Sequence, residues 1–150
     1  KTDRNRCFFD LAENTKSPEI CSEIDDNRMR SDCSMRISEI LSSEDPGRAL
    51  ESCESAENKD NCYWGIVEST KTEDPDTALS ACSRLSMNSN DCRFDVARSQ
   101  LNIDVEKALS VCSRMEYEYQ ENDCYFMTIE TPQLTLADPD RAIETCGKVT

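Results

Sequence analysis

The sequence predicts an all-α, disulfide-stapled α-solenoid of about five antiparallel helical hairpins, with a period of about 30 residues. Three observations predict this fold. A segment that begins with Asp-Pro and ends with a cysteine recurs along the chain, and a second cysteine segment alternates with it. The chain also has ten cysteines but few bulky apolar residues. We therefore expect one helical-repeat domain over residues 1–150.

The first repeated segment reads Asp-Pro-x-x-Ala-Leu-x-x-Cys and is typical of a short helix. Proline suits the first helical position because its missing N–H has no intrahelical acceptor there, and Val105 replaces it in one copy. The alanine and the leucine or isoleucine before each cysteine share its helical face, so we expect the cysteine to point inward. The expected N-caps are Asp45, Asp74, Asp104 and Asp138.

The second repeated segment is a polar pair followed by a cysteine, and it predicts the start of another helix. Either member of the pair would cap that helix. The pairs are Ser31-Asp32, Asp60-Asn61, Asn90-Asp91 and Asn122-Asp123. Large apolar side chains follow two residues after each cysteine, at Met35, Trp64, Phe94 and Phe126, and Ile37, Ile66, Val96 and Thr128 follow at four residues. Aromatic residues at helical spacing usually belong to a core, so we expect Trp64 to be a packing residue rather than a ligand-binding one.

The two cysteine series advance by 29 to 34 residues per copy, which sets the expected hairpins. The start of the chain fits the same pattern, because Phe9 and Leu11 follow Cys7. The expected hairpins are residues 5–24, 31–56, 60–85, 90–115 and 122–149.

Two disulfide pairings fit the spacing. The first closes each hairpin on itself, because the two ends of an antiparallel pair meet, and it uses all ten thiols. Such staples would each contribute on the order of 3 kcal/mol in the chain-entropy model. The expected pairs are Cys7–Cys21, Cys33–Cys53, Cys62–Cys82, Cys92–Cys112 and Cys124–Cys146. The alternative pairing links cysteines across the shorter loops and leaves Cys7 and Cys146 unpaired. Its bonds are Cys21–Cys33, Cys53–Cys62, Cys82–Cys92 and Cys112–Cys124.

Composition places the protein outside the cytosol. Leu, Ile, Val and Phe make up only 26 of 150 residues, and the net charge is −14, which without cross-links is the profile of a disordered chain. Structural disulfides persist in secreted, periplasmic or cell-surface proteins. No apolar run is long enough for membrane insertion by this segment. We expect Lys1 to follow a removed signal peptide, a lipidated tether or an artificial chain boundary.

Residues 7–37 resemble a cysteine-rich helical repeat of secreted and lipoprotein-like proteins of archaea and bacteria. That repeat has a Cys-aromatic-x-x-x-Ala helix, a Leu/Ile-Cys-x-x-Ile segment and an Arg-Asp-Cys start. The later copies depart from it through the added Asp-Pro-x-x-Ala-Leu helix and longer spacings. The resemblance implies a fold and a location, but no chemistry. The matching residues are Cys7, Phe8, Ala12, Ile20, Cys21, Ile24, Arg30, Asp32 and Cys33.

The same composition argues against several functions. With 31 acidic and 17 basic residues the chain has no basic face for nucleic acid, so a basic protein or a cation is the favoured partner. The chain has no histidine, no Cys-x-x-Cys and only three glycines, which removes the usual general base, thioredoxin-like exchange and a phosphate-binding loop. We expect neither an enzyme nor a cofactor.

A metal-binding protein is the alternative. The acidic loops at residues 25–27, 57–61, 88–91 and 120–123 carry carboxylate and amide oxygens that could coordinate Ca²⁺, although helix capping explains the same residues. If the cysteines were reduced, they could instead bind Cu(I).

A protein partner fits the sequence better. Tyr117 and Tyr119 lie in an acidic loop, and an insertion in the last repeat carries Leu134 and Leu136. Tyrosine is enriched at interfaces, so we expect these four residues to bind a partner, unless they cover the core of the last repeat. The sequence thus predicts a non-catalytic, extracytoplasmic binding or assembly module. One form would be an acidic inhibitor or immunity-type protein for a basic partner.

Overall fold

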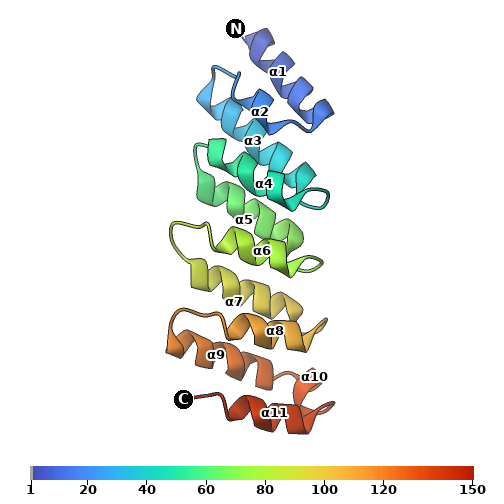
Figure 1. Cartoon of the computed structure of the whole chain (residues 1–150), viewed down its shortest axis with the longest axis vertical. Helices are drawn as coiled ribbons and strands as arrows, with labels where there is room; N and C mark the ends of the chain where they lie inside the picture. Colours follow the sequence, from blue (N-terminus) through green and yellow to red (C-terminus); the bar gives the residue numbers. More distant parts are fainter. Residues whose placement is uncertain (1) are drawn as a thin grey trace. The chain divides into compact units, whose positions relative to one another are not determined.

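The computed structural model describes residues 2–150, which form helices and no strand (Figure 1). Lys1, and the expectation about what precedes it, lie outside the described residues. The helices are α1 (Thr2–Thr15), α2 (Pro18–Cys21), α3 (Asn27–Leu41), α4 (Pro46–Ser52), the 3₁₀ helix η1 (Cys53–Ser55), α5 (Lys59–Thr70), α6 (Pro75–Cys82), α7 (Ser89–Gln100), α8 (Val105–Cys112), α9 (Glu118–Ile129), α10 (Pro132–Thr135) and α11 (Pro139–Cys146).

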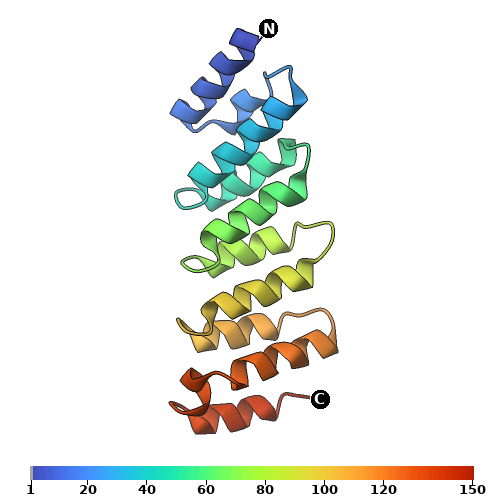
Figure 2. The same cartoon turned by 180° about the vertical axis from the view of Figure 1, so that it is seen from behind.

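Long and short helices alternate along the chain, and each long helix contacts the short helix that follows it. The chain divides into two compact units, which we call unit 1 (up to Ser86, helices α1–α6) and unit 2 (Met87–Thr150, helices α7–α11). In unit 1 the long helices α1, α3 and α5 lie on one side and the short helices α2, α4 and α6 on the other (Figure 2). Consecutive long helices contact each other within each unit.

The predicted starts of the four Asp-Pro-type helices are confirmed. Each N-cap aspartate accepts a hydrogen bond from the backbone N–H three residues later, which satisfies a donor that has no intrahelical acceptor. The pairs are Asp45–Arg48, Asp74–Thr77, Asp104–Lys107 and Asp138–Arg141, with N···O distances of 3.2, 3.2, 3.0 and 3.0 Å.

The predicted starts of the long helices are wrong. These helices begin earlier, and the polar pairs lie inside them rather than at the N-cap. In α3 the cap is Asp26, which accepts from the Met29 N–H at 2.8 Å. In α5 it is Asn58, which accepts from the Asn61 N–H at 3.0 Å. The polar residues two positions before each cysteine have a different role.

One hydrogen bond recurs in all five helix pairs. The side-chain oxygen two residues before the cysteine of the long helix accepts from a backbone N–H four residues after the cysteine of the following short helix. It satisfies a loop N–H and fixes the register of the two helices. The five bonds are Asn5–Asp25 (3.2 Å), Ser31–Glu57 (3.2 Å), Asp60–Ser86 (3.1 Å), Asn90–Glu116 (3.3 Å) and Asn122–Thr150 (3.3 Å).

The disulfide pairing expected from the sequence is wrong. The bonds Cys21–Cys33, Cys53–Cys62 and Cys112–Cys124 link a short helix to the long helix that follows it, as in the alternative pairing. Cys82 and Cys92 are also disulfide-bonded, whereas Cys7 and Cys146 are free and exposed. None of the expected pairs Cys7–Cys21, Cys33–Cys53, Cys62–Cys82, Cys92–Cys112 and Cys124–Cys146 is therefore present.

Helix geometry explains this correction. The side chain that bonds the loop of its own pair stands two residues before the cysteine, and two residues turn the helix by about 200°. In α5, Asp60 bonds Ser86 of its own pair, so Cys62 lies on nearly the opposite side and reaches Cys53 of the preceding pair. A cysteine in this position cannot reach its own short helix.

Small polar residues fill much of the core. Thr70 and Thr128 are almost fully buried, and each donates its hydroxyl to the backbone carbonyl four residues earlier, at 2.7 and 2.9 Å. Ser38 and Ser52 are buried as well and donate to carbonyls three residues earlier. Because these hydroxyls are satisfied locally, a chain with few large apolar residues can still bury a continuous interior.

We predict that alkylation of the folded, unreduced protein modifies two thiols, those of Cys7 and Cys146, because the other eight cysteines are disulfide-bonded. Intact-mass spectrometry counts the modified thiols, and nonreducing peptide mapping should recover a Cys53–Cys62 link. Five disulfides with no free thiol, or a peptide linking Cys33 to Cys53, would contradict the structure.

We also predict that Asp60 makes stability depend on pH. Hydrogen bonds from the Ser86 hydroxyl and backbone N–H lower the pKa of the Asp60 carboxyl. The carboxylate therefore stabilises the fold above its unfolded pKa of about 3.9, and this contribution is lost as the pH falls through the lower folded pKa. Urea unfolding of Asp60→Asn should show a weaker loss of stability below about pH 4 than the wild type. The exposed control Asp10→Asn should keep the wild-type pH dependence.

Candidate functional site

Large apolar side chains recur on the long helices two residues after each cysteine position. In unit 1 they are Phe9, Met35 and Trp64, and in unit 2 they are Phe94 and Phe126. We call these residues the apolar row. All are half-buried except Phe126, which is 52% exposed on the last long helix.

Trp64, which the sequence predicts to be a packing residue, is half-buried, and its position on the helix explains why. The position four residues after the cysteine lies about 40° from it around the helix, and Ile37 and Ile66 at that position are buried. The position two residues after the cysteine lies about 200° away, at the edge of the buried face. Trp64 is therefore only half-buried, while its neighbour Tyr63 is 1% exposed.

Acidic side chains border the row. Each row residue has two neighbours about one helical turn away on its own helix: the residue one position before the cysteine and the residue six positions after it. On the five long helices these are ten positions, and seven of them are acidic. The acidic residues are Glu13, Asp32, Glu39, Glu68, Asp91, Asp123 and Glu130, and the basic ones are Arg6 and Arg98.

Two of the cations near the row are held in place by their surroundings. Arg36 of α3 bonds Glu13 of α1 at 2.9 Å and Glu39 at 3.3 Å, and these hydrogen bonds raise the pKa of the Arg36 guanidinium. Arg98 lies over the Phe94 ring, 5.6 Å from its centroid. The second contact shows that a row aromatic accepts a cation on its face.

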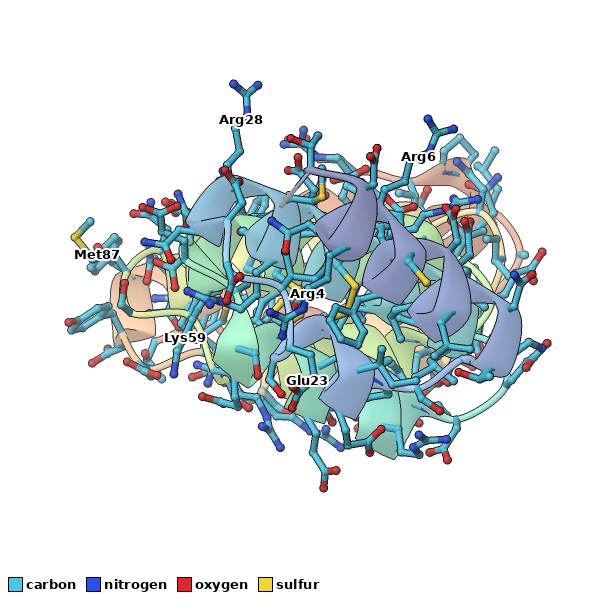
Figure 3. All side chains as sticks on the ribbon, turned by 90° about the horizontal axis from the view of Figure 1, so that it is seen from above. Arg4, Arg6, Glu23, Arg28, Lys59 and Met87 are labelled. Carbon is cyan, nitrogen blue, oxygen red and sulfur yellow. A yellow bond between two sulfur atoms is a disulfide. The ribbon has the colours of Figure 1, made fainter. Side chains whose placement is uncertain are left out.

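The surface is hollowed at Phe9. A pocket of about 600 Å³ lies between α1 and the start of α3, and it is lined by Arg6, Phe9, Asp10, Asp26, Arg28, Met29 and Asp32. Figure 3 shows the side chains of Arg6 and Arg28 projecting on the same side of the ribbon. Within residues 2–150 neither arginine forms a salt bridge. The row thus begins at an open hollow with an apolar floor and charged walls.

Of the four residues expected to bind a partner, the structure brings two together. Tyr117 and Tyr119 are 55% and 63% exposed, and their rings stack with centroids 5.8 Å apart. Leu136 is 80% exposed, but it does not lie with the tyrosines along the chain. It follows α10, whereas the tyrosines are at the start of α9, a helix about 18 Å long. Leu134 is fully buried, so the expectation that it contacts a partner is wrong.

Leu134 is buried because the inserted residues form a helix of their own. α10 contacts both α9 and α11, and its one inward position is occupied by Leu134. Leu136 lies just beyond the end of this one-turn helix and points away from the core. The insertion therefore covers the core of the last repeat with one leucine and exposes the other.

The structure adds nothing in favour of the metal-binding alternative. Among residues 2–150 there is no group of three or more His, Cys, Asp or Glu side chains placed to hold a metal ion. The acidic loop residue Asp60 is engaged by Ser86, and Asp26 and Asn58 are helix caps. Eight cysteines are in disulfides and are not thiolate ligands for copper.

Comparison with protein-family models, curated proteins and solved structures found no match to this chain. None of the helices in the described range is both long and apolar enough to cross a membrane.

The sequence shows the apolar row, but helical spacing alone predicts that its members belong to the core. The signal that separates the two interpretations is its angular distance from the cysteine. A residue that shares the cysteine's face lies three or four positions away, and a residue two positions away lies elsewhere on the helix.

We predict that Trp64, the single tryptophan of the chain, is open to solvent quenchers in an acidic environment. Acrylamide should quench its fluorescence, and cationic caesium should quench it more strongly than anionic iodide at low salt, because the bordering carboxylates attract cations. Adding salt should reduce the difference between the two ions. Emission insensitive to acrylamide would place Trp64 in the core.

Proposed function

We propose that this protein is a non-catalytic, extracytoplasmic binding module built as a disulfide-stapled α-solenoid of helical hairpins, and that its long helices bind a basic segment of a partner protein. The apolar row carries this proposal. Within each unit, apolar side chains at one register of successive long helices form a surface that extends from pair to pair, as repeat proteins use for binding. Folded monomers rarely leave such a surface without a role.

The chemistry of the row indicates the partner. Aromatic faces and aliphatic side chains receive the stems and charged ends of lysine and arginine, and the seven bordering carboxylates attract positive charge. The Arg98–Phe94 contact is an internal example of the same interaction. The net charge of −14 favours fast encounter with a basic protein at low salt. An inhibitor or immunity-type role, in which an acidic protein neutralises a basic one, is one form of this function.

The extracytoplasmic location rests on the four disulfides formed by eight of the ten cysteines, which an oxidising compartment maintains. The resemblance of residues 7–37 to a repeat of secreted and lipoprotein-like proteins supports the same location. The exposed Tyr117–Tyr119 stack offers a second contact area in unit 2, because two rigid aromatic rings supply contact area at little entropic cost.

Calorimetric titration with synthetic peptides tests the proposal. A peptide that alternates arginine with leucine should bind the wild type and shift the emission of Trp64, whereas a peptide with glutamate in place of arginine should not bind. Trp64→Ala should weaken binding of the basic peptide about tenfold or more, since a central aromatic contact is worth roughly 1.5–2 kcal/mol. Raising the salt concentration should weaken it further.

Ile103→Ala provides the matched control, because Ile103 is 60% exposed but lies in the turn before α8, outside the row. This variant should bind like the wild type. Equal loss in both variants, or unchanged affinity in Trp64→Ala, would remove the row from the binding surface.

A further inference from the structure

The contact between a short helix and the long helix that follows it recurs within the units, at α2–α3, at α4–α5 and at α8–α9. We call this contact a joint. Its cysteines are disulfide-bonded and buried. Beside the disulfide, each joint buries the long-helix residue that stands four positions after the cysteine. The α4–α5 and α8–α9 joints also bury a short-helix leucine that stands three positions before its cysteine. These are Leu50 and Ile66 at α4–α5, and Leu109 and Thr128 at α8–α9, all between 0% and 6% exposed.

The last short helix, α11, carries the residues of half of such a joint, and these residues are exposed. Ile143 stands where Leu50 and Leu109 stand, three residues before the cysteine, but is 71% exposed, and Cys146 is free. Phe126 of the adjoining α9 is also more exposed than the other members of the apolar row. We call Phe126, Ile143 and Cys146 the tail face.

The first long helix, α1, carries the other half. Leu11 stands where Ile66 and Thr128 stand, four residues after the cysteine, but is 46% exposed, and Cys7 is free. We call Cys7 and Leu11 the head face. The two faces together contain what the α4–α5 and α8–α9 joints contain, namely two cysteines and, three residues before one and four after the other, two side chains that are buried when the helices meet.

We propose that the tail face of one chain binds the head face of a second copy and repeats the internal joint between molecules, with Cys146 linked to Cys7. The inference does not depend on the apolar row binding a basic segment. Ile143 and Leu11 would be buried against the facing helix, and α1 of the second copy would lie beside α9 with its Phe126, because long helices on the two sides of an internal joint contact each other.

Charge supports this orientation. In the α4–α5 joint, Lys59, three residues before the long-helix cysteine, bonds Glu54 just after the short-helix cysteine at 2.6 Å. Arg4 stands at the same position before Cys7 and would face the carboxyl end of α11. The carboxyl end of a helix carries a partial negative charge, which attracts a cation.

The covalent step needs an oxidant, and a small-molecule disulfide such as oxidised glutathione supplies it. The thiol of Cys146, the thiol of Cys7 from the second copy and one oxidised glutathione yield one interchain disulfide and two reduced glutathiones by two thiol–disulfide exchanges. Because head and tail are different faces, the association is heterologous, so it continues into open filaments or closes into rings.

Two cysteine variants test the pairing without reducing the internal disulfides. In oxidised glutathione the wild type should form a ladder of oligomers on nonreducing gels, with a Cys7–Cys146 peptide in the digest. Cys7→Ser and Cys146→Ser should each stay monomeric alone, and their mixture should stop at dimers. Homodimers of either single variant, a monomer whose two thiols stay free, or a Cys7–Cys146 link within one chain would overturn the proposal.

The apolar contact is tested separately. Ile143→Glu should reduce the yield of linked oligomers roughly tenfold or more, because the joint would have to bury a charge in place of an isoleucine. Ile103→Glu adds the same charge at an isoleucine that is 60% exposed and lies outside both faces, and it should leave the yield within twofold of the wild type. Equal yields in the two variants would show that random thiol collision, and not docking of the faces, links the chains.

Discussion

The fold depends on a two-residue spacing in each long helix. A polar side chain binds the loop of its own helix pair, and the cysteine two residues later points to the other side of the helix. In α5 these contacts are the Asp60–Ser86 hydrogen bond and the Cys53–Cys62 disulfide. One contact closes a pair and the other joins it to the preceding pair, so the long helices α3, α5 and α9 are each fixed on two sides. Neither contact alone would define both the pair and its neighbour.

This arrangement explains how so acidic a chain folds with so few large apolar residues. The joints at Cys21–Cys33 and Cys112–Cys124 each close 12 residues, and the joint at Cys53–Cys62 closes 9. Loops of this size contribute on the order of 3 kcal/mol each in the chain-entropy model. Buried hydroxyls such as those of Thr70 and Thr128 bond carbonyls of their own helix, so the core needs no large side chains at those places.

The same repeat leaves two kinds of surface open. Along the long helices, the half-buried row lies between carboxylates and suits a basic, partly apolar segment. On α1 and α11, the residues that are buried in the internal joints are exposed, with one half of a joint on each helix. The first surface follows from where a residue stands around its helix, and the second consists of joint positions that are exposed on α1 and α11.

The sequence by itself determined the helical class, the alternation of two helix types, the N-caps at Asp45 and its equivalents, and the presence of disulfides. These features depend on residues a few positions apart, whose relation is set by one helical turn. Only the tertiary structure decided which thiols pair, that Leu134 is buried, and that Trp64 is only half-buried. Spacing along the chain gives the order of the contacts, but the side of the helix that faces each neighbour depends on how the helices pack.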